Sequence, residues 1–112
     1  DETGEGAGHG FNLNLPLPAG CPVHDWFAAL DVALSRIVAF RADALVVSLG
    51  LDAFAGDPIS TFQLEAADFL RLGQRLAAAR LPVIFVLEGG YAAAELGVNA
   101  VNVLDGFEQV CA

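Results

Sequence analysis

The sequence predicts an α/β fold, a parallel sheet flanked by helices. Two apolar, largely β-branched runs, at residues 44–50 and 82–90, alternate with stretches of helical periodicity. The chain is also 55% hydrophobic, and a sheet covered by helices needs that much apolar surface. Strands separated by helices require right-handed crossovers, so the strands should be parallel.

Each predicted element has its own pattern. Residues 11–18 alternate apolar and polar side chains and end at Pro16 and Pro18, which predicts a first strand. The two apolar runs predict strands buried on both faces. Apolar residues recur at helical spacing in three stretches, which predicts helices at residues 24–40, 65–80 and 92–110. We therefore expect three strands and three helices, with no repeat and no second domain in residues 1–112.

Composition excludes several classes of function. The formal charge is −9, with five arginines and no lysine, so nucleic acid is not an expected partner. No apolar run reaches the ~18 residues of a membrane span, so no membrane partner is expected. Cys21 and Cys111 form no C-x-x-C pair, and two reduced thiols indicate a cytoplasmic protein.

The amino-terminal residues indicate that the chain is part of a longer polypeptide. The chain contains no methionine and opens on DETGEGAGHG, which has the composition of the middle of a loop. We expect the chain to be the carboxyl-terminal part of a longer polypeptide, whose remainder is its first partner. The oligomeric state stays open, a homo-oligomer included.

Polar residues follow the two apolar strands. Asp52 and Asp57 lie in the loop after residues 44–50, and Tyr91 follows a glycine pair after the next strand. Both loops belong to the carboxyl edge of a parallel sheet, where open α/β folds bind ligands. Considered one at a time, the three residues have structural interpretations. Asp52 is interpreted as a loop or helix-cap residue, Asp57 as the first residue of an Asp-Pro turn, and Tyr91 as a surface aromatic residue.

The two histidines are expected to be solvated and to take no part with Asp52. His9 lies in the glycine-rich stretch, and His24 begins a helix that we place at the opposite edge of the sheet from Asp52. Neither is spaced to join Asp52 around a metal. The sequence alone therefore leaves a structural and a metal-binding role for Asp52 open.

Taken together, SLGLDAFAGDP and VLEGGY resemble the zinc-dependent deacetylases, the family of histone deacetylases and acetylpolyamine amidohydrolases. GFNLNLPLP and DPISTFQL extend this resemblance over nearly the whole chain. ELGVNAVNVLDGF and Phe54 are most similar to the acetylpolyamine amidohydrolases. The resemblance implies an arginase-like fold, of which residues 1–112 form the carboxyl-terminal part.

The resemblance also implies roles for single residues. Asp52, the aspartate of a G-x-D motif, corresponds to the last of three ligands of a catalytic zinc (Zn²⁺), and Tyr91 to the hydrogen-bond donor of the transition state. Ile59 corresponds to a residue lining the substrate tunnel, and Gly89 and Gly90 to its wall. The other two zinc ligands and a histidine pair are implied to lie upstream.

Some family members also bind potassium (K⁺) through backbone carbonyls. Phe11 matches one of those positions in the resemblance. A potassium site is therefore a second, separate expectation.

Three functions are compatible with these features to different degrees. The favoured one is a zinc-dependent amidohydrolase that removes acetyl groups from small amines, with acetylated polyamines ahead of acetyl-lysine. The alternative is a truncated, non-catalytic deacetylase fragment that serves at most as an interaction module. A nucleotide-binding domain is disfavoured, because no glycine-rich phosphate loop follows a predicted strand.

Overall fold

The computed structural model describes residues 2–111. Its elements are, in order, the 3-10 helix η1 (Gly6–Gly8), α1 (Val23–Phe40), β1 (Leu45–Leu49), α2 (Ala66–Ala78), β2 (Val83–Leu87) and α3 (Ala93–Cys111). The three helices and two of the three strands therefore lie where apolar periodicity predicts them. None of the helices in the described part of the chain is long and apolar enough to cross a membrane.

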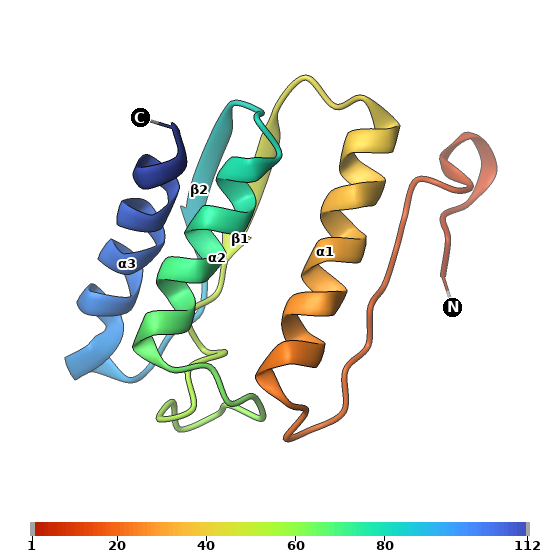
Figure 1. Ribbon diagram of the computed structural model, residues 1–112. Helices are drawn as coiled ribbons and strands as arrows, with labels where there is room; N and C mark the ends of the chain where they lie inside the picture. The colour runs from red at the N-terminus through yellow and green to blue at the C-terminus, as the bar shows by residue number, and fades with distance from the viewer. Residues whose placement is uncertain (1, 112) are drawn as a thin grey trace.

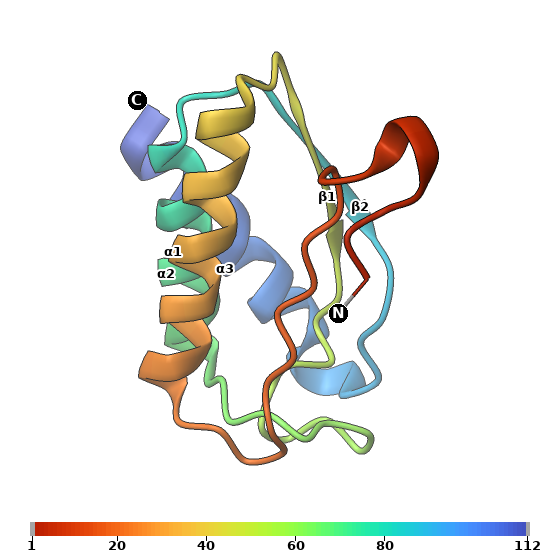
Figure 2. The same ribbon diagram turned by 90° about the vertical axis from the view of Figure 1, so that its right-hand side faces the viewer.

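The sheet consists of two parallel strands, β1 and β2, and the three helices lie on one side of it (Figures 1 and 2). Leu45 pairs with Val83 and Leu49 with Leu87. The pairing continues beyond both strands, because the Leu51 amide donates to the Gly89 carbonyl at 2.8 Å. This extension brings the two loops that follow the strands to one edge of the sheet.

Only one face of the sheet is covered by the described residues. Val47 and Phe85 pack against the core, whereas Val46 and Ile84 on the other face are exposed. The prediction of strands buried on both faces is therefore wrong for residues 2–111. The physical reason is that all three helices pack on the same side, so alternate side chains of each strand meet no partner within this part of the chain.

The predicted strand at residues 11–18 is also wrong. This segment is not assigned to a strand. Figure 2 shows it on the side of α1 that faces the sheet, not in the layer of the helices. Phe11 packs edge-on against Phe40 at a centroid distance of 5.5 Å. Alternation identified a segment without helix, but a strand also needs a neighbouring strand for its backbone groups. In the described residues the sheet contains only β1 and β2, which pair with each other and not with this segment.

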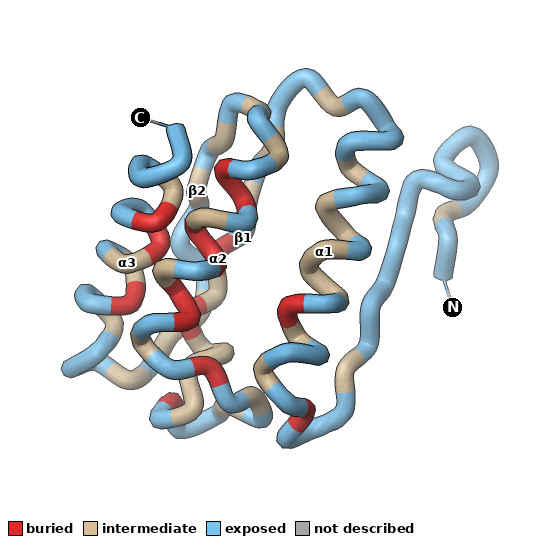
Figure 3. Tube along the Cα trace, in the orientation of Figure 1, coloured by how far each residue is buried: buried red, intermediate tan, exposed pale blue. Residues whose placement is uncertain are grey.

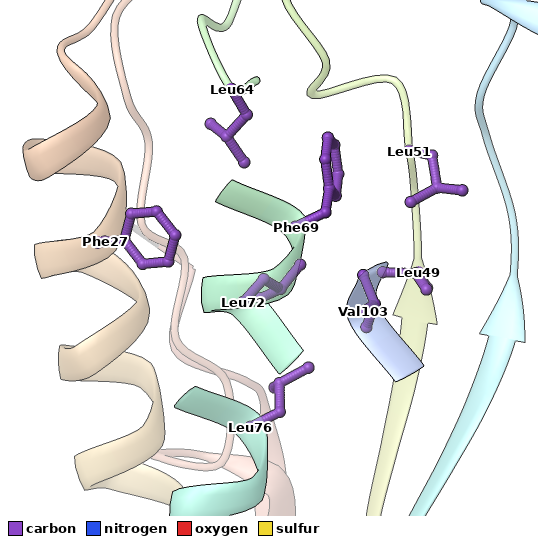
Figure 4. Close-up of a cluster of buried hydrophobic side chains, with 8 residues drawn as sticks. All are labelled: Phe27, Leu49, Leu51, Leu64, Phe69, Leu72, Leu76 and Val103. Atoms are coloured by element: carbon purple, nitrogen blue, oxygen red, sulfur yellow. The ribbon is translucent and has the colours of Figure 1, made fainter. Parts of the chain in front are cut away.

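The core lies between the sheet and the central helix α2 (Figures 3 and 4). Phe69 and Val103 are completely buried there. Helices α2 and α3 approach closely, because any side chain larger than hydrogen at Gly73 or Gly106 would collide with the backbone of the other helix. This tight contact fixes α3, and with it the loop that enters α3 from β2.

Helix α1 is attached to α2 by charged groups over an aromatic ring. The Arg71 guanidinium lies 4.2 Å from the centroid of the buried Phe27 ring, a cation–π arrangement. Arg75 also pairs with Asp31 at 2.6 Å. These contacts hold the start of α1 close to the loop after β1.

Candidate functional site at the carboxyl edge of the sheet

Two loops meet at the carboxyl edge of the sheet, the lower end of the molecule in Figure 1. The first follows β1 and closes on itself, since the Ala55 amide donates to the Leu64 carbonyl at 2.8 Å. The second joins β2 to α3 and contains Gly89, Gly90 and Tyr91. The predicted site residues Asp52, Ile59, Gly89, Gly90 and Tyr91 therefore all lie on these two loops, as the topology implied.

The carboxylate of Asp52 lies directly over Gly89. A Cβ atom at residue 89 would stand 2.9 Å from Asp52 Cγ and closer still to Oδ2, and a Cβ at Gly50 would stand 2.8 Å from Oδ1. Glycine at both positions leaves the space that the carboxylate occupies. The aspartate from the first loop and the glycine pair of the second loop are thus in direct contact.

The Asp52 carboxylate has the chemistry of one zinc ligand. Carboxylate oxygens bind Zn²⁺, and the side-chain hydrogen bonds within residues 2–111 use the carboxylates of Asp31, Asp57 and Asp68 but not that of Asp52. The residue as a whole is half-buried. Residues 2–111 contain no group of three metal-binding side chains, so Asp52 would need ligands from elsewhere.

Gly90 turns the chain so that Tyr91 faces outward. Its φ of 140° is a conformation that residues with a side chain rarely adopt. A Cβ there would also stand 2.6 Å from Leu96 Cδ1 and 3.0 Å from Leu51 Cβ. The turn is therefore packed against the first loop and against α3, and the Tyr91 residue that follows it is 58% exposed.

Asp57 connects the two loops. Its Oδ2 accepts hydrogen bonds from the backbone amides of Tyr91, at 2.6 Å, and Ala92, at 3.1 Å. Its Oδ1 accepts one from the amide of Ile59 at 3.0 Å. Sequence reasoning gave Asp57 a local turn role, which the Ile59 contact confirms, but it missed the bonds to the second loop. Nothing in an Asp-Pro pair indicates a partner more than thirty residues away.

The environment of Asp57 favours its ionised form. Burial raises the pKa of the Asp57 carboxyl, and the hydrogen bonds from the amides of Tyr91, Ile59 and Ala92 lower it. The three bonds together outweigh the effect of burial, so the pKa lies below its ordinary value. The residue is only 6% exposed. The bonds to Tyr91 and Ala92 also lie at the amino end of α3, where the helix dipole favours a negative charge.

The remaining predicted residues lie at different distances from this edge. Ile59 is 63% exposed, on the same loop as Asp52. Phe11, the residue matched to a potassium site, contacts the last residue of α1 and so lies at the other end of that helix. The potassium expectation stays a prediction.

The position predicted for His24 is wrong. The Gly20 amide donates to the Thr61 carbonyl at 2.6 Å, so the start of α1 lies at the same edge as Asp52. A helix that precedes a strand of the sheet begins at the edge where that strand ends. The expectation of solvation is confirmed, because the His24 side chain is 81% exposed and pairs only with Asp25 among the described residues.

Relatives of this chain carry informative names. Acetylpolyamine amidohydrolase 2 of Pseudomonas aeruginosa is 53% identical over 110 residues, which is 98% of this chain and 32% of that protein. Acetylpolyamine amidohydrolase of Mycoplana ramosa is 48% identical over 106 residues, 95% of this chain and 31% of that protein. The chain therefore spans about a third of the length of these relatives.

Solved structures show the same fold. The crystal structure of acetylpolyamine aminohydrolase from Burkholderia pseudomallei matches with a TM-score of 0.93 and 41% identity, over 96% of this chain and 32% of that one. The histone deacetylase Clr3 matches with a TM-score of 0.84 and 34% identity, over 93% of this chain and 18% of that one. The α/β fold class, with its deacetylase-like architecture, is thereby confirmed.

The sequence model of the histone deacetylase domain matches residues 1–107. This match covers the sheet, α1, α2, both loops of the candidate site and most of α3. The chain belongs to the histone deacetylase family.

Proposed function

We propose that the chain is the carboxyl-terminal part of a zinc-dependent amidohydrolase that removes acetyl groups from small amines. One observation carries this proposal: the Asp52 carboxylate lies against Gly89, two residues before Tyr91. A carboxylate for the metal and a phenol for the substrate are thus held by one pair of touching loops. The relatives' names, acetylpolyamine amidohydrolase, support the reaction class.

Asp52 and Tyr91 would have different roles in the reaction. Asp52 would supply one carboxylate ligand to Zn²⁺, which when bound polarises an amide carbonyl and lowers the pKa of a coordinated water. Tyr91 would donate its hydroxyl proton in a hydrogen bond to the acetyl oxygen, where negative charge develops as the carbonyl is attacked. The exposed Ile59 would line the substrate tunnel. Gly89 and Gly90 would form part of the wall of that tunnel.

The substrate class that we propose is an acetylated polyamine, ahead of acetyl-lysine in proteins. The chain carries a formal charge of −9, and a negative surface raises the local concentration of a cationic small molecule. The names of the two relatives described above support the same class. The other two ligands of the zinc would come from the remainder of the polypeptide, so residues 1–112 alone should be inactive.

The test compares variants of the complete polypeptide. Asp52→Ala should lose stoichiometric zinc, measured by mass spectrometry of the metal, together with turnover of an acetylated polyamine. Tyr91→Phe should keep its zinc and lower kcat by about 10²–10³, the usual effect of removing one such donor. Its KM should change little, because the bond strengthens chiefly in the transition state.

Asp43→Asn is the matched control. Asp43 is exposed in the turn before β1, so the variant removes the same charge away from the site and should keep both zinc and turnover. Full zinc content and turnover in Asp52→Ala would refute the metal assignment. A parent protein that acts faster on an acetyl-lysine peptide than on an acetylated polyamine would refute the substrate class.

A further inference from the structure

The backbone of Tyr91 is held by a side chain from the other loop. Within the second loop, Gly90 turns the chain by its positive φ, and the Leu51 amide fixes Gly89 through its carbonyl. Neither of these features holds the backbone of residue 91 itself. The short bond from the Tyr91 amide to Asp57 Oδ2, at 2.6 Å, does so.

The same carboxylate also fixes the residue opposite. Asp57 Oδ1 accepts from the Ile59 amide, so one planar group sets the backbone of both Ile59 and Tyr91. Both residues are exposed at this edge of the sheet. Because Asp57 is nearly buried and its charge is stabilised by amides at the start of α3, it has little freedom to move.

We propose that Asp57 is a positioning residue for the reaction, which clamps the two loops together and so fixes where the Tyr91 ring and the Ile59 side chain stand. This inference rests on the proposed function, because it concerns the placement of the Tyr91 hydroxyl. A displacement of about 1 Å in a catalytic group is enough to lower a rate by about 10²-fold. Asp57 itself does not touch substrate in this assignment.

A substitution of one atom tests the clamp. In Asp57→Asn the amide group keeps the shape, but its NH₂ must face at least one of the three backbone N–H donors. Whichever way the amide turns, at least one hydrogen bond is replaced by two donors in contact. The variant should therefore loosen one or both loops while the core between the sheet and α2 remains intact.

A double-mutant cycle separates positioning from a purely structural role. In the complete polypeptide, Asp57→Asn should lower kcat by about 10–100-fold with zinc content unchanged. In the Tyr91→Phe background the same change should lower kcat by less than about threefold, because no hydroxyl is left to misplace. A structural role would lower kcat by the same factor in both backgrounds.

Hydrogen exchange provides a readout that is independent of activity. The amides of Tyr91 and Ala92 should exchange faster in Asp57→Asn than in the parent, measured by mass spectrometry on peptides covering residues 89–96. The Asp43→Asn control should exchange at the parent rate. If Asp57→Asn does not fold, Asp57→Glu replaces it, since that variant keeps the charge and shifts the carboxylate by one methylene.

Each outcome supports or overturns either this inference alone or the proposed function with it. Faster exchange with a loss of kcat that depends on Tyr91 supports the inference. Unchanged kcat, or equal losses in both backgrounds, overturns it and leaves the proposed function standing. An inactive parent, or a Tyr91→Phe variant at full rate, overturns the proposed function and this inference together.

Discussion

Gly89→Ala is the sharpest perturbation of the candidate site, because it adds one methyl group against the carboxylate of Asp52. The backbone of Gly89 is outside the left-handed region, so alanine fits the chain conformation without strain. The effect is therefore purely steric. The added Cβ would stand 2.9 Å from Asp52 Cγ and nearer to Oδ2.

The size of the effect follows from that distance. Carbon atoms in contact prefer a separation of about 3.5–4.0 Å, so the carboxylate must move by about 0.5–1 Å or rotate away. A zinc ligand displaced by this amount no longer meets the ion in its preferred geometry. We expect weaker zinc binding and a kcat lower by about 10²-fold, the effect of a misplacement of about 1 Å.

The assay measures zinc content, kcat and thermal unfolding of the complete polypeptide in parallel. Unfolding should change little, since only a half-buried side chain moves. Gly97→Ala is the matched control, because a Cβ at Gly97 meets nothing within 4 Å and should leave zinc and turnover unchanged. A Gly89→Ala protein with full zinc and a kcat within twofold of the parent would refute the contact between Asp52 and Gly89 as a determinant of the site.

Three further predictions concern stability and association. The lowered pKa of Asp57 stabilises the fold fully above the ordinary aspartate value of about 3.9 and less as the pH falls through the folded-state pKa. In urea unfolding, the difference between the parent and Asp57→Asn should therefore shrink below about pH 4; a difference that grows would contradict this. Gly106→Ala places a Cβ against the Leu70 carbonyl and should destabilise by about 1–3 kcal/mol, whereas Gly97→Ala in the same helix should stabilise by up to about 1 kcal/mol; chemical denaturation showing equal effects would refute the close helix contact. Residues 1–112 alone should self-associate through the exposed face of the sheet, and Ile84→Lys should reduce this in sedimentation velocity; a monomeric parent would refute it.

The order and type of most elements could be predicted because they depend on local patterns. Apolar side chains at helical spacing located α1, α2 and α3, and β-branched runs located β1 and β2. The strand predicted at residues 11–18 failed because alternation describes a backbone conformation but does not supply a strand to pair with. The edge predicted for His24 was wrong because α1 runs antiparallel to β1, the strand that follows it, and so begins at the edge where β1 ends.

The candidate site was predictable in part for the same reason. Parallel topology alone brings the loops after β1 and β2 to one edge, so Asp52 and Tyr91 could be placed near each other from the sequence. The contact between Asp52 and Gly89 could not, because it depends on side-chain positions within about one ångström. Asp57 was assigned to a turn, since its burial and its partners in the second loop are invisible in a local motif.

By itself the sequence determined what is encoded in short-range patterns and in residue type: helical and strand periodicity, the acidic charge, the glycine pair before Tyr91 and the motifs of the deacetylase family. The tertiary structure decided what depends on packing between distant segments. In the folded chain the helices cover one face of the sheet, and α2 and α3 are in close contact at two glycines. Asp57, which the sequence assigns to a local turn, links the two loops of the site. Such contacts depend on how the folded chain excludes water and satisfies buried polar groups, which no single segment specifies.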